Sequence, residues 1–310
     1  MKDSLASGQS GTSPSGDQAR IAFIELVQAW ISRSATEDGR NWFNTTLDGI
    51  RHSADTSRLA FAIGLAPRRL GKADLTLSAE DRTQAAAIRA NLDPGDWSID
   101  QAARIAFSVA SHHGDDAAFV SWFDGFCATA GINELIALCR GLPVYPAPTL
   151  IEPRAREAVR SGMRPVFEAV AHCNPYPVEY FAEDAWNQMV VKAFFIGAHL
   201  WPIQALDRRG NPRLARMLVD LAQERWAAGR PVSGEVWRCV APHADNVGDA
   251  ALVRAFDTGD DKERLAVALA LQQAGEHRVD ALFERPESRQ QVKTLQSRLA
   301  SEGIGWKALS

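Results

Sequence analysis

The stretch that decides the fold is DAALVRAFDTGDDKERLAVALALQQAGEHRVDALF, residues 249–283. It holds three apolar segments with helical spacing, 249–256, 263–274 and 278–283, separated by Gly-Asp-Asp and Gly-Glu turns. Its many alanines allow neighbouring helices to approach closely. Short helices joined by tight polar turns are typical of stacked helical repeats. We therefore expect a repeat-like part over residues 245–310.

The rest of the chain also has the pattern of successive helices. Apolar residues follow helical spacing over 21–31 and over 59–65, where the second helix is expected to end near Pro67. Ser78 and Ser98 are predicted helix N-caps, and Asp115 or Asp116 is predicted to start the following helix. Strand-like alternation is confined to short pieces such as 73–77. The predicted fold class is all-α, either an irregular α-solenoid with HEAT-like helical repeats or a multi-helix bundle.

The composition of the termini and of one internal run bears on domain organisation. Residues 1–17 are rich in Ser and Gly and predict a flexible tail with no secretory signal. The remaining residues, 18–310, are predicted to form a single all-α domain. The run Leu142-Pro143-Val144-Tyr145-Pro146-Ala147-Pro148 must interrupt the helical pattern and is a natural boundary or corner.

Composition and charge exclude several classes of protein. The 310 residues are 46% hydrophobic with a formal net charge of −4, which disfavours nucleic-acid binding. The four cysteines lie in apolar surroundings without C-x-x-C spacing, which indicates reduced thiols in a cytoplasmic protein. The longest apolar stretch, 193–203, contains His199 and Pro202 and falls short of the roughly 20 residues that span a bilayer. Direct membrane insertion is therefore not expected.

Familiar catalytic and cofactor motifs are absent from the sequence. It contains no G-x-G-x-x-G, P-loop, H-E-x-x-H or G-x-S-x-G motif, so no cofactor and no metal are predicted. His112 and His113 precede Asp115 and Asp116, but this group fits a helix cap better than a metal site. The residues Arg156, Arg160 and Arg164 are spaced to form a cationic stripe on one helix, which would either bind an anion or face solvent.

Polar residues are densest between residues 174 and 230, in segments that are otherwise apolar helix. If they are buried they need partners, since an unsatisfied polar group costs roughly 1 to 3 kcal/mol. The turn Asn174-Pro175-Tyr176-Pro177 is predicted to be extended and to stop the preceding helix. The polar faces of two helices are expected to meet here in one pocket. The predicted ligand-binding residues are Asn174, Tyr176, Asn187, Gln188, Lys192, Arg216, Asp220 and Glu224.

Three residues of this region are candidates for acid/base chemistry. Glu168 and His172 are four residues apart and share one helix face, and Asp220 could approach them from a later helix. The alternative for Glu168 and His172 is a hydrogen-bonded pair in the core. For Arg216, Asp220 and Glu224, at i, i+4 and i+8, the alternative is a salt-bridged helix face.

The central blocks resemble a known family. AWNQMVVKAFFIG at 185–197, LDRRGN at 206–211 and ERWAAGR at 224–230 follow one another as in the EboA family, and the resemblance extends over about residues 42–240. It implies a role in bacterial secondary metabolism and in metabolite traffic across bacterial membranes. It also implies partners from the same gene cluster, which encodes a prenyltransferase-like membrane protein. The family supplies no catalytic residue that can be placed on this chain.

Two functions therefore remain open from the sequence. The first is a non-catalytic helical scaffold that binds a small-molecule metabolite or a partner protein near Asn187 and Lys192. The second is an enzyme acting on a cyclitol-like or phosphorylated metabolite, with Glu168, His172 or Asp220 as acid or base.

Overall fold

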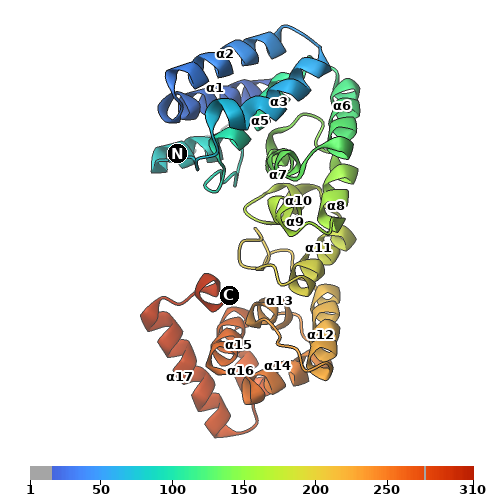
Figure 1. Ribbon diagram of the computed structural model, residues 1–310. Helices are drawn as coiled ribbons and strands as arrows, with labels where there is room; N and C mark the ends of the chain where they lie inside the picture. Colours follow the sequence, from blue (N-terminus) through green and yellow to red (C-terminus); the bar gives the residue numbers. More distant parts are fainter. Residues whose placement is uncertain (1–15, 276) are drawn as a thin grey trace, which may run out of the picture. The chain divides into compact units, whose positions relative to one another are not determined.

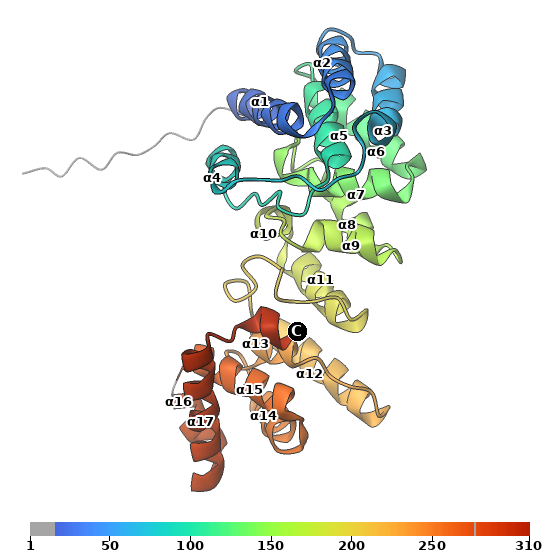
Figure 2. The ribbon, with the colours of Figure 1, turned by 60° about the vertical axis from the view of Figure 1, so that its left-hand side comes forward.

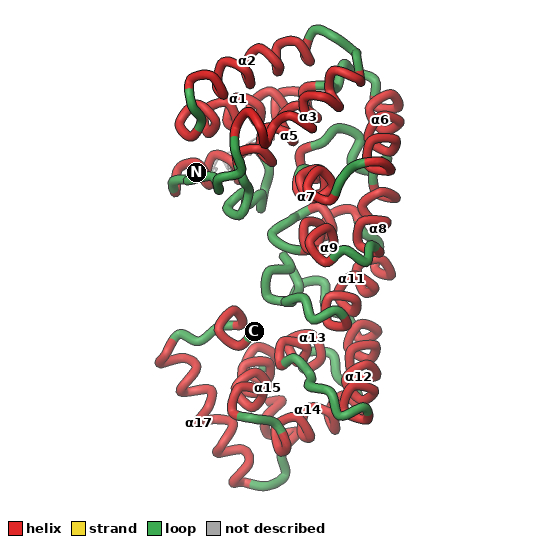
Figure 3. The backbone as a smooth tube through the Cα atoms, in the orientation of Figure 1, coloured by secondary structure: helices red, strands yellow, loops and turns green. Residues whose placement is uncertain are grey.

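The computed structural model describes residues 16–275 and 277–310. Of the tail predicted over residues 1–17, residues 1–15 lie outside the described part, and Gly16 and Asp17 begin the first helix. The described residues form 17 α-helices and no strand, which confirms the all-α prediction (Figure 3). They divide into two compact units, one ending at Ile151 and the other beginning at Glu152. The division follows closely on the proline-rich run.

The N-terminal unit is built from seven helices (Figure 1). They are α1 Gly16–Ser34, α2 Glu37–Arg51, α3 Thr56–Leu70, α4 Ala79–Ile88, α5 Ile99–Ala110, α6 Asp116–Thr129 and α7 Ile132–Arg140. Helix α5 is central, because α1, α2, α3 and α7 all pack against it. All of its residues except Gln101 are buried. Its sequence, IDQAARIAFSVA, suits that position because small alanines on every face admit close neighbours.

Two helix starts in this unit follow the predicted caps. The Asp115 carboxylate accepts a hydrogen bond from the Ala118 amide at 3.0 Å and caps α6, which confirms the cap interpretation. Ser78 and Asp81 form a reciprocal capping box at the start of α4. Residues 73–77 form no sheet, and the described part of the chain has only an isolated bridge there, between Asp74 and Ser98.

Helix α3 continues past Pro67 and ends at Leu70, close to the predicted end. A proline inside a helix lacks the N–H that would bond to the carbonyl four residues earlier, here that of Ile63. The buried Arg104 of α5 replaces that donor, because its Nε donates to the Ile63 carbonyl at 3.0 Å. Arg104 Nη1 also donates to the Asn133 carbonyl in α7 at 2.8 Å. One buried arginine thus joins three helices and lets α3 continue to Leu70.

The C-terminal unit contains ten helices among its described residues (Figure 2). They are α8 Glu152–Arg160, α9 Arg164–Ala171, α10 Tyr176–Tyr180, α11 Glu183–Phe195, α12 Pro212–Ala227, α13 Trp237–Val240, α14 Asn246–Thr258, α15 Asp261–Ala274, α16 His277–Leu282 and α17 Pro286–Glu302. Helices close in sequence pack as neighbours, including α8 with α9, α11 with α12, and α14 with α15. The three helices predicted in 249–283 correspond to α14, α15 and α16.

Helix α15 is the core of the last part of this unit. Seven consecutive residues, Leu265 to Leu271, are buried, and α13, α14 and α17 pack around them. The alanines at 266, 268 and 270 account for this close packing, as the sequence pattern predicts. None of the helices in the described part of the chain has the combination of length and apolar character that crossing a bilayer requires.

The expected arginine stripe does not lie on a single helix, so that prediction is wrong. Helix α8 ends at Arg160, and Arg164 begins α9. Gly162 and Pro165 explain the break, because proline is favoured in the first turn of a new helix. Arg164 pairs with Glu168 at 2.7 Å.

Candidate functional site

The Asn174-Pro175-Tyr176-Pro177 segment is not extended, because Tyr176 begins the short helix α10. The Asn174 side chain connects two helices: its Nδ2 donates to the Ala169 carbonyl at the end of α9, at 3.0 Å, and its Oδ1 accepts from the Tyr176 amide at 3.0 Å. Asn174 and Tyr176 are both buried. Burial also raises the pKa of the Tyr176 hydroxyl. The amide of Asn174 therefore supports the chain reversal between α9 and α10.

Asn187 of α11 is buried and meets another asparagine. Its amide exchanges two hydrogen bonds with that of Asn211, at 3.2 and 2.9 Å. Asn211 is the N-cap of α12, where its Oδ1 accepts from the Leu214 amide at 2.9 Å. The pair fixes the start of α12 against α11. The neighbouring Gln188 is exposed.

Arg209, which the sequence analysis did not single out, lies beside this pair. Its guanidinium donates to the carbonyls of Pro177, Val178 and Phe181 at 2.8 to 3.1 Å. It also stacks over the ring of Trp186, 4.6 Å from the centroid. Because those carbonyls belong to the α10 region, Arg209 ties α10 to α11 and to the loop before α12.

The side chain of Lys192, also in α11, contacts the end of α8 and not the asparagine pair. Its ammonium donates to the carbonyls of Val159 and Ser161, at 2.5 and 2.6 Å, and lies 5.6 Å from the centroid of the Phe167 ring. Val159 is in the last turn of α8, where carbonyls have no partner within the helix. Partial desolvation lowers the pKa of Lys192. The lysine thus caps the end of α8.

The charged residues predicted on α12 form an ion-pair group at its surface. Arg216 bonds Asp220 at 3.3 Å and Asp245 at 2.6 Å, and about half of each side chain is exposed. Glu224 is exposed farther along the helix. The predicted ligand-binding residues therefore lie at several places: the α9–α10 turn, the start of α12, the end of α8, and the surface of α12. Ligand binding by these residues stays a prediction.

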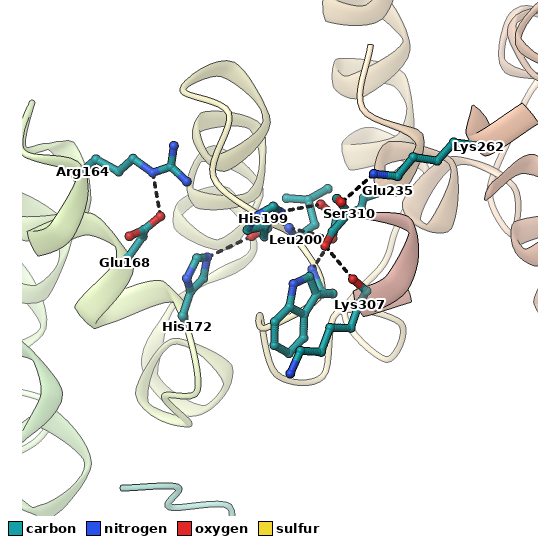
Figure 4. A network of polar contacts seen from close by, with 10 residues as sticks. Arg164, Glu168, His172, His199, Leu200, Glu235, Lys262, Lys307 and Ser310 are labelled. Atoms are coloured by element: carbon teal, nitrogen blue, oxygen red, sulfur yellow. Dashed lines mark hydrogen bonds and ion pairs between the residues drawn. The ribbon is translucent and has the colours of Figure 1, made fainter. Parts of the chain in front are cut away.

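The acid/base candidates Glu168 and His172 have separate partners (Figure 4). Glu168 pairs with Arg164, and His172 Nε2 donates to the backbone carbonyl of His199 at 2.9 Å. Asp220 belongs to the ion-pair group on α12. The three candidates are thus engaged by different neighbours.

His199 and Glu235 form a carboxylate–imidazole pair that the sequence analysis missed (Figure 4). Glu235 Oε2 lies 3.6 Å from His199 Nδ1, and the two side chains are 3% and 49% exposed. The other carboxylate oxygen accepts the amides of Leu200 and Trp201, at 3.1 and 2.7 Å. The sequence offered one signal for this pair, because Glu235 is a charged residue directly before the apolar Val236 and Trp237.

His172 makes the stability of the protein depend on pH. Desolvation lowers the pKa of its imidazole, although Glu168 and the His199 carbonyl oppose the shift. Below pH 6.5, the ordinary value for histidine, the unfolded state therefore binds more protons at this residue than the folded state does. We expect the free energy of unfolding to decrease as the pH is lowered through this range, and to decrease less in His172→Gln. Urea titrations at pH 7.5 and 5.5 measure the free energy of unfolding of both proteins. An equal change between the two pH values in wild type and His172→Gln would contradict the prediction.

Metal-ligating side chains are not clustered in the described residues. No three His, Cys, Asp or Glu residues there lie close enough to hold an ion. His112 instead bonds Asp116 at 2.8 Å, and the adjacent Asp115 caps α6.

Among the pockets of the described residues, one pair lies in the N-terminal unit, outside the predicted site. One, of about 210 Å³, lies between the α2–α3 loop and the start of α6. The other, of about 280 Å³, lies between α2 and α3 and is lined by Trp42, Arg58 and Phe61, among others. No polar residue of the predicted site lines either pocket.

Comparison with known proteins gives one match. The sequence profile of the family described as metabolite traffic protein EboA matches residues 23–241. The chain belongs to the EboA family. No curated protein and no solved structure matches the chain. The EboA match begins farther toward the N-terminus than the resemblance over 42–240; it covers most of α1 and all of α2 to α13, whereas α14 to α17 lie beyond its end.

Proposed function

We propose that this EboA-family chain takes part in the biosynthesis or traffic of a small metabolite as a cytoplasmic helical protein that binds the metabolite or a partner protein. The family description supports the pathway. The partners we propose are proteins of the same gene cluster, including the prenyltransferase-like membrane protein.

The binding role is supported by the hydrogen bonds and ion pairs that the predicted polar residues make. Glu168, His172 and Asp220 are held by Arg164, the His199 carbonyl and Arg216. Asn187 and Lys192 bond to a helix cap and to helix-end carbonyls. Acid/base catalysis requires such groups to reach the same reacting atoms. Glu168, His172 and Asp220 instead have separate partners, and Asn187 and Lys192 stabilise helix ends.

Mass spectrometry tests this proposal. The purified protein is incubated with a metabolite extract of its source organism, separated by gel filtration, and analysed for bound compounds. We expect at least one compound to elute with the protein, with its mass and total amount unchanged by the incubation. Heat-denatured protein is the control. Consumption of a compound together with formation of a product would contradict a binding role.

The second candidate is an enzyme that uses acid/base chemistry on a cyclitol-like or phosphorylated metabolite. The specific observation in its favour is the half-exposed His199 imidazole beside the buried Glu235 carboxylate, an arrangement that can orient a general base. If turnover is found in the extract, His199→Ala should abolish it, and Glu168→Gln should leave it unchanged. Turnover unaffected by His199→Ala would exclude this pair as the acid and base.

A further inference from the structure

The 210 Å³ pocket of the N-terminal unit has an apolar interior and an acidic rim. Its buried lining residues are Ile50, Leu59 and Phe119, with 1%, 2% and 4% of their surface exposed. Two exposed carboxylates, Asp55 and Asp115, belong to the same lining. Neither lysine nor arginine lines this pocket. A ligand would therefore meet negative charge at the entrance and apolar side chains inside.

Both carboxylates are helix N-caps, and each uses one oxygen for that purpose. Asp55 Oδ1 accepts the amide of Ser57 at 2.9 Å and that of Arg58 at 3.4 Å, and Asp115 Oδ1 accepts the Ala118 amide at 3.0 Å. The Oδ2 atoms make no hydrogen bond to the described residues. Asparagine and serine cap helices as well as aspartate does, so capping alone does not require two negative charges here.

The aromatic part of the lining suits an organic cation. Phe119 and Trp122 both line the pocket, with ring centroids 5.8 Å apart and planes tilted by 51°. Tryptophan is the side chain that attracts a nearby ammonium most strongly through the face of its ring. An inorganic ion would leave the apolar interior unused, and the lining offers no arrangement of three metal-ligating side chains.

We propose that this pocket binds a small organic cation, an amine with an aromatic or aliphatic body. The body occupies the space between Ile50, Leu59, Phe119 and Trp122, and the ammonium pairs with Asp55 and Asp115. His113, the other titratable side chain of the lining, is exposed. The inference rests on the proposed binding function and names the ligand class.

Three probes of the same shape and different charge test the proposal. Benzylamine, benzyl alcohol and benzoate are titrated into protein labelled with nitrogen-15, and the indole N–H signal of Trp122 is followed by NMR after its assignment with Trp122→Phe. We expect benzylamine to shift this signal, benzyl alcohol to bind at least about fivefold more weakly, and benzoate to leave it unchanged. Equal binding of amine and alcohol, or no shift with benzylamine, would overturn the proposal.

Isosteric variants test whether the two carboxylate charges bind the ligand, without removing the helix caps. Asp55→Asn and Asp115→Asn keep both helix caps, so we expect unchanged thermal unfolding and a loss of about fivefold each in benzylamine affinity. Asp260→Asn is the matched control, because Asp260 caps α15 in the other unit by the same bond, to Glu263. Full affinity in both pocket variants would overturn the proposal, as would an equal loss in the control.

Failure of the cation-pocket proposal can be distinguished from failure of the proposed binding function. If the extract yields a bound metabolite while benzylamine fails to shift the Trp122 signal, the binding function stands and the cation assignment fails. If the extract shows turnover while benzylamine still binds with the expected charge dependence, the non-catalytic function fails and the cation pocket stands.

Discussion

Replacing Asp100 with alanine is expected to lower the free energy of unfolding by about 3 to 5 kcal/mol. Asp100 and Arg104 lie 3.5 Å apart in α5, with side chains 5% and 3% exposed. Burial lowers the pKa of the Arg104 guanidinium, and Asp100 is the group that most opposes this shift. Without the carboxylate, the buried Arg104 loses its largest interaction with an opposite charge, and only the weaker one with Glu134 remains. Urea unfolding followed by circular dichroism measures the loss.

A double variant tests whether the unpaired charge is the cause. Asp100→Leu combined with Arg104→Met removes both charges and keeps apolar volume, so it should be less destabilising than Asp100→Ala. The Ile63 and Asn133 carbonyls then lose their donor, which leaves part of the cost in place. A double variant less stable than the single one would show that these hydrogen bonds outweigh the charge pairing.

Replacing Arg209 with alanine is expected to cost about 3 kcal/mol, because three carbonyls of the α10 region lose a charged donor together. The ring of Trp186 also loses the guanidinium stacked on it. Hydrogen exchange measured by mass spectrometry should show the largest increase in peptides covering α10 and the start of α11. Unfolding in urea gives the global cost.

Arg209→Lys is the matched control for this prediction. It keeps the positive charge but not the planar group that reaches several carbonyls at once, so its stability should lie between those of the wild type and Arg209→Ala. If lysine restores full stability, charge alone explains the contribution of Arg209, and the geometry of the guanidinium does not matter.

The sequence predicted local structure well, because local structure depends on neighbouring residues. The apolar spacing and turns of 249–283 predicted three helices, and Asp115 was a recognisable cap. The continuation of α3 past Pro67 was not predicted, since the group that replaces the missing donor, Arg104, comes 37 residues later in the numbering. Long-range compensation of this kind has no signature in a local pattern.

The polar site was predicted only in part, for a similar reason. Asn187 and Lys192 stood out as polar residues in an apolar helix that would need partners, and partners are present. Those partners are an amide in a loop and two backbone carbonyls at another helix end, and backbone carbonyls are available at every position of a sequence. Glu235 was missed because its role depends on the backbone amides of Leu200 and Trp201.

The central position of α5 also has a consequence for synthesis on the ribosome. Helices α1, α2 and α3 emerge before α5 and can cover part of it at once, but α7 emerges later. Arg104 can reach the Ile63 carbonyl as soon as α5 forms, whereas its second acceptor, on Asn133, does not yet exist. The nascent chain therefore exposes an alanine-rich apolar face and a half-satisfied guanidinium until α7 arrives. During that interval the N-terminal unit exposes apolar surface of the kind that chaperones bind.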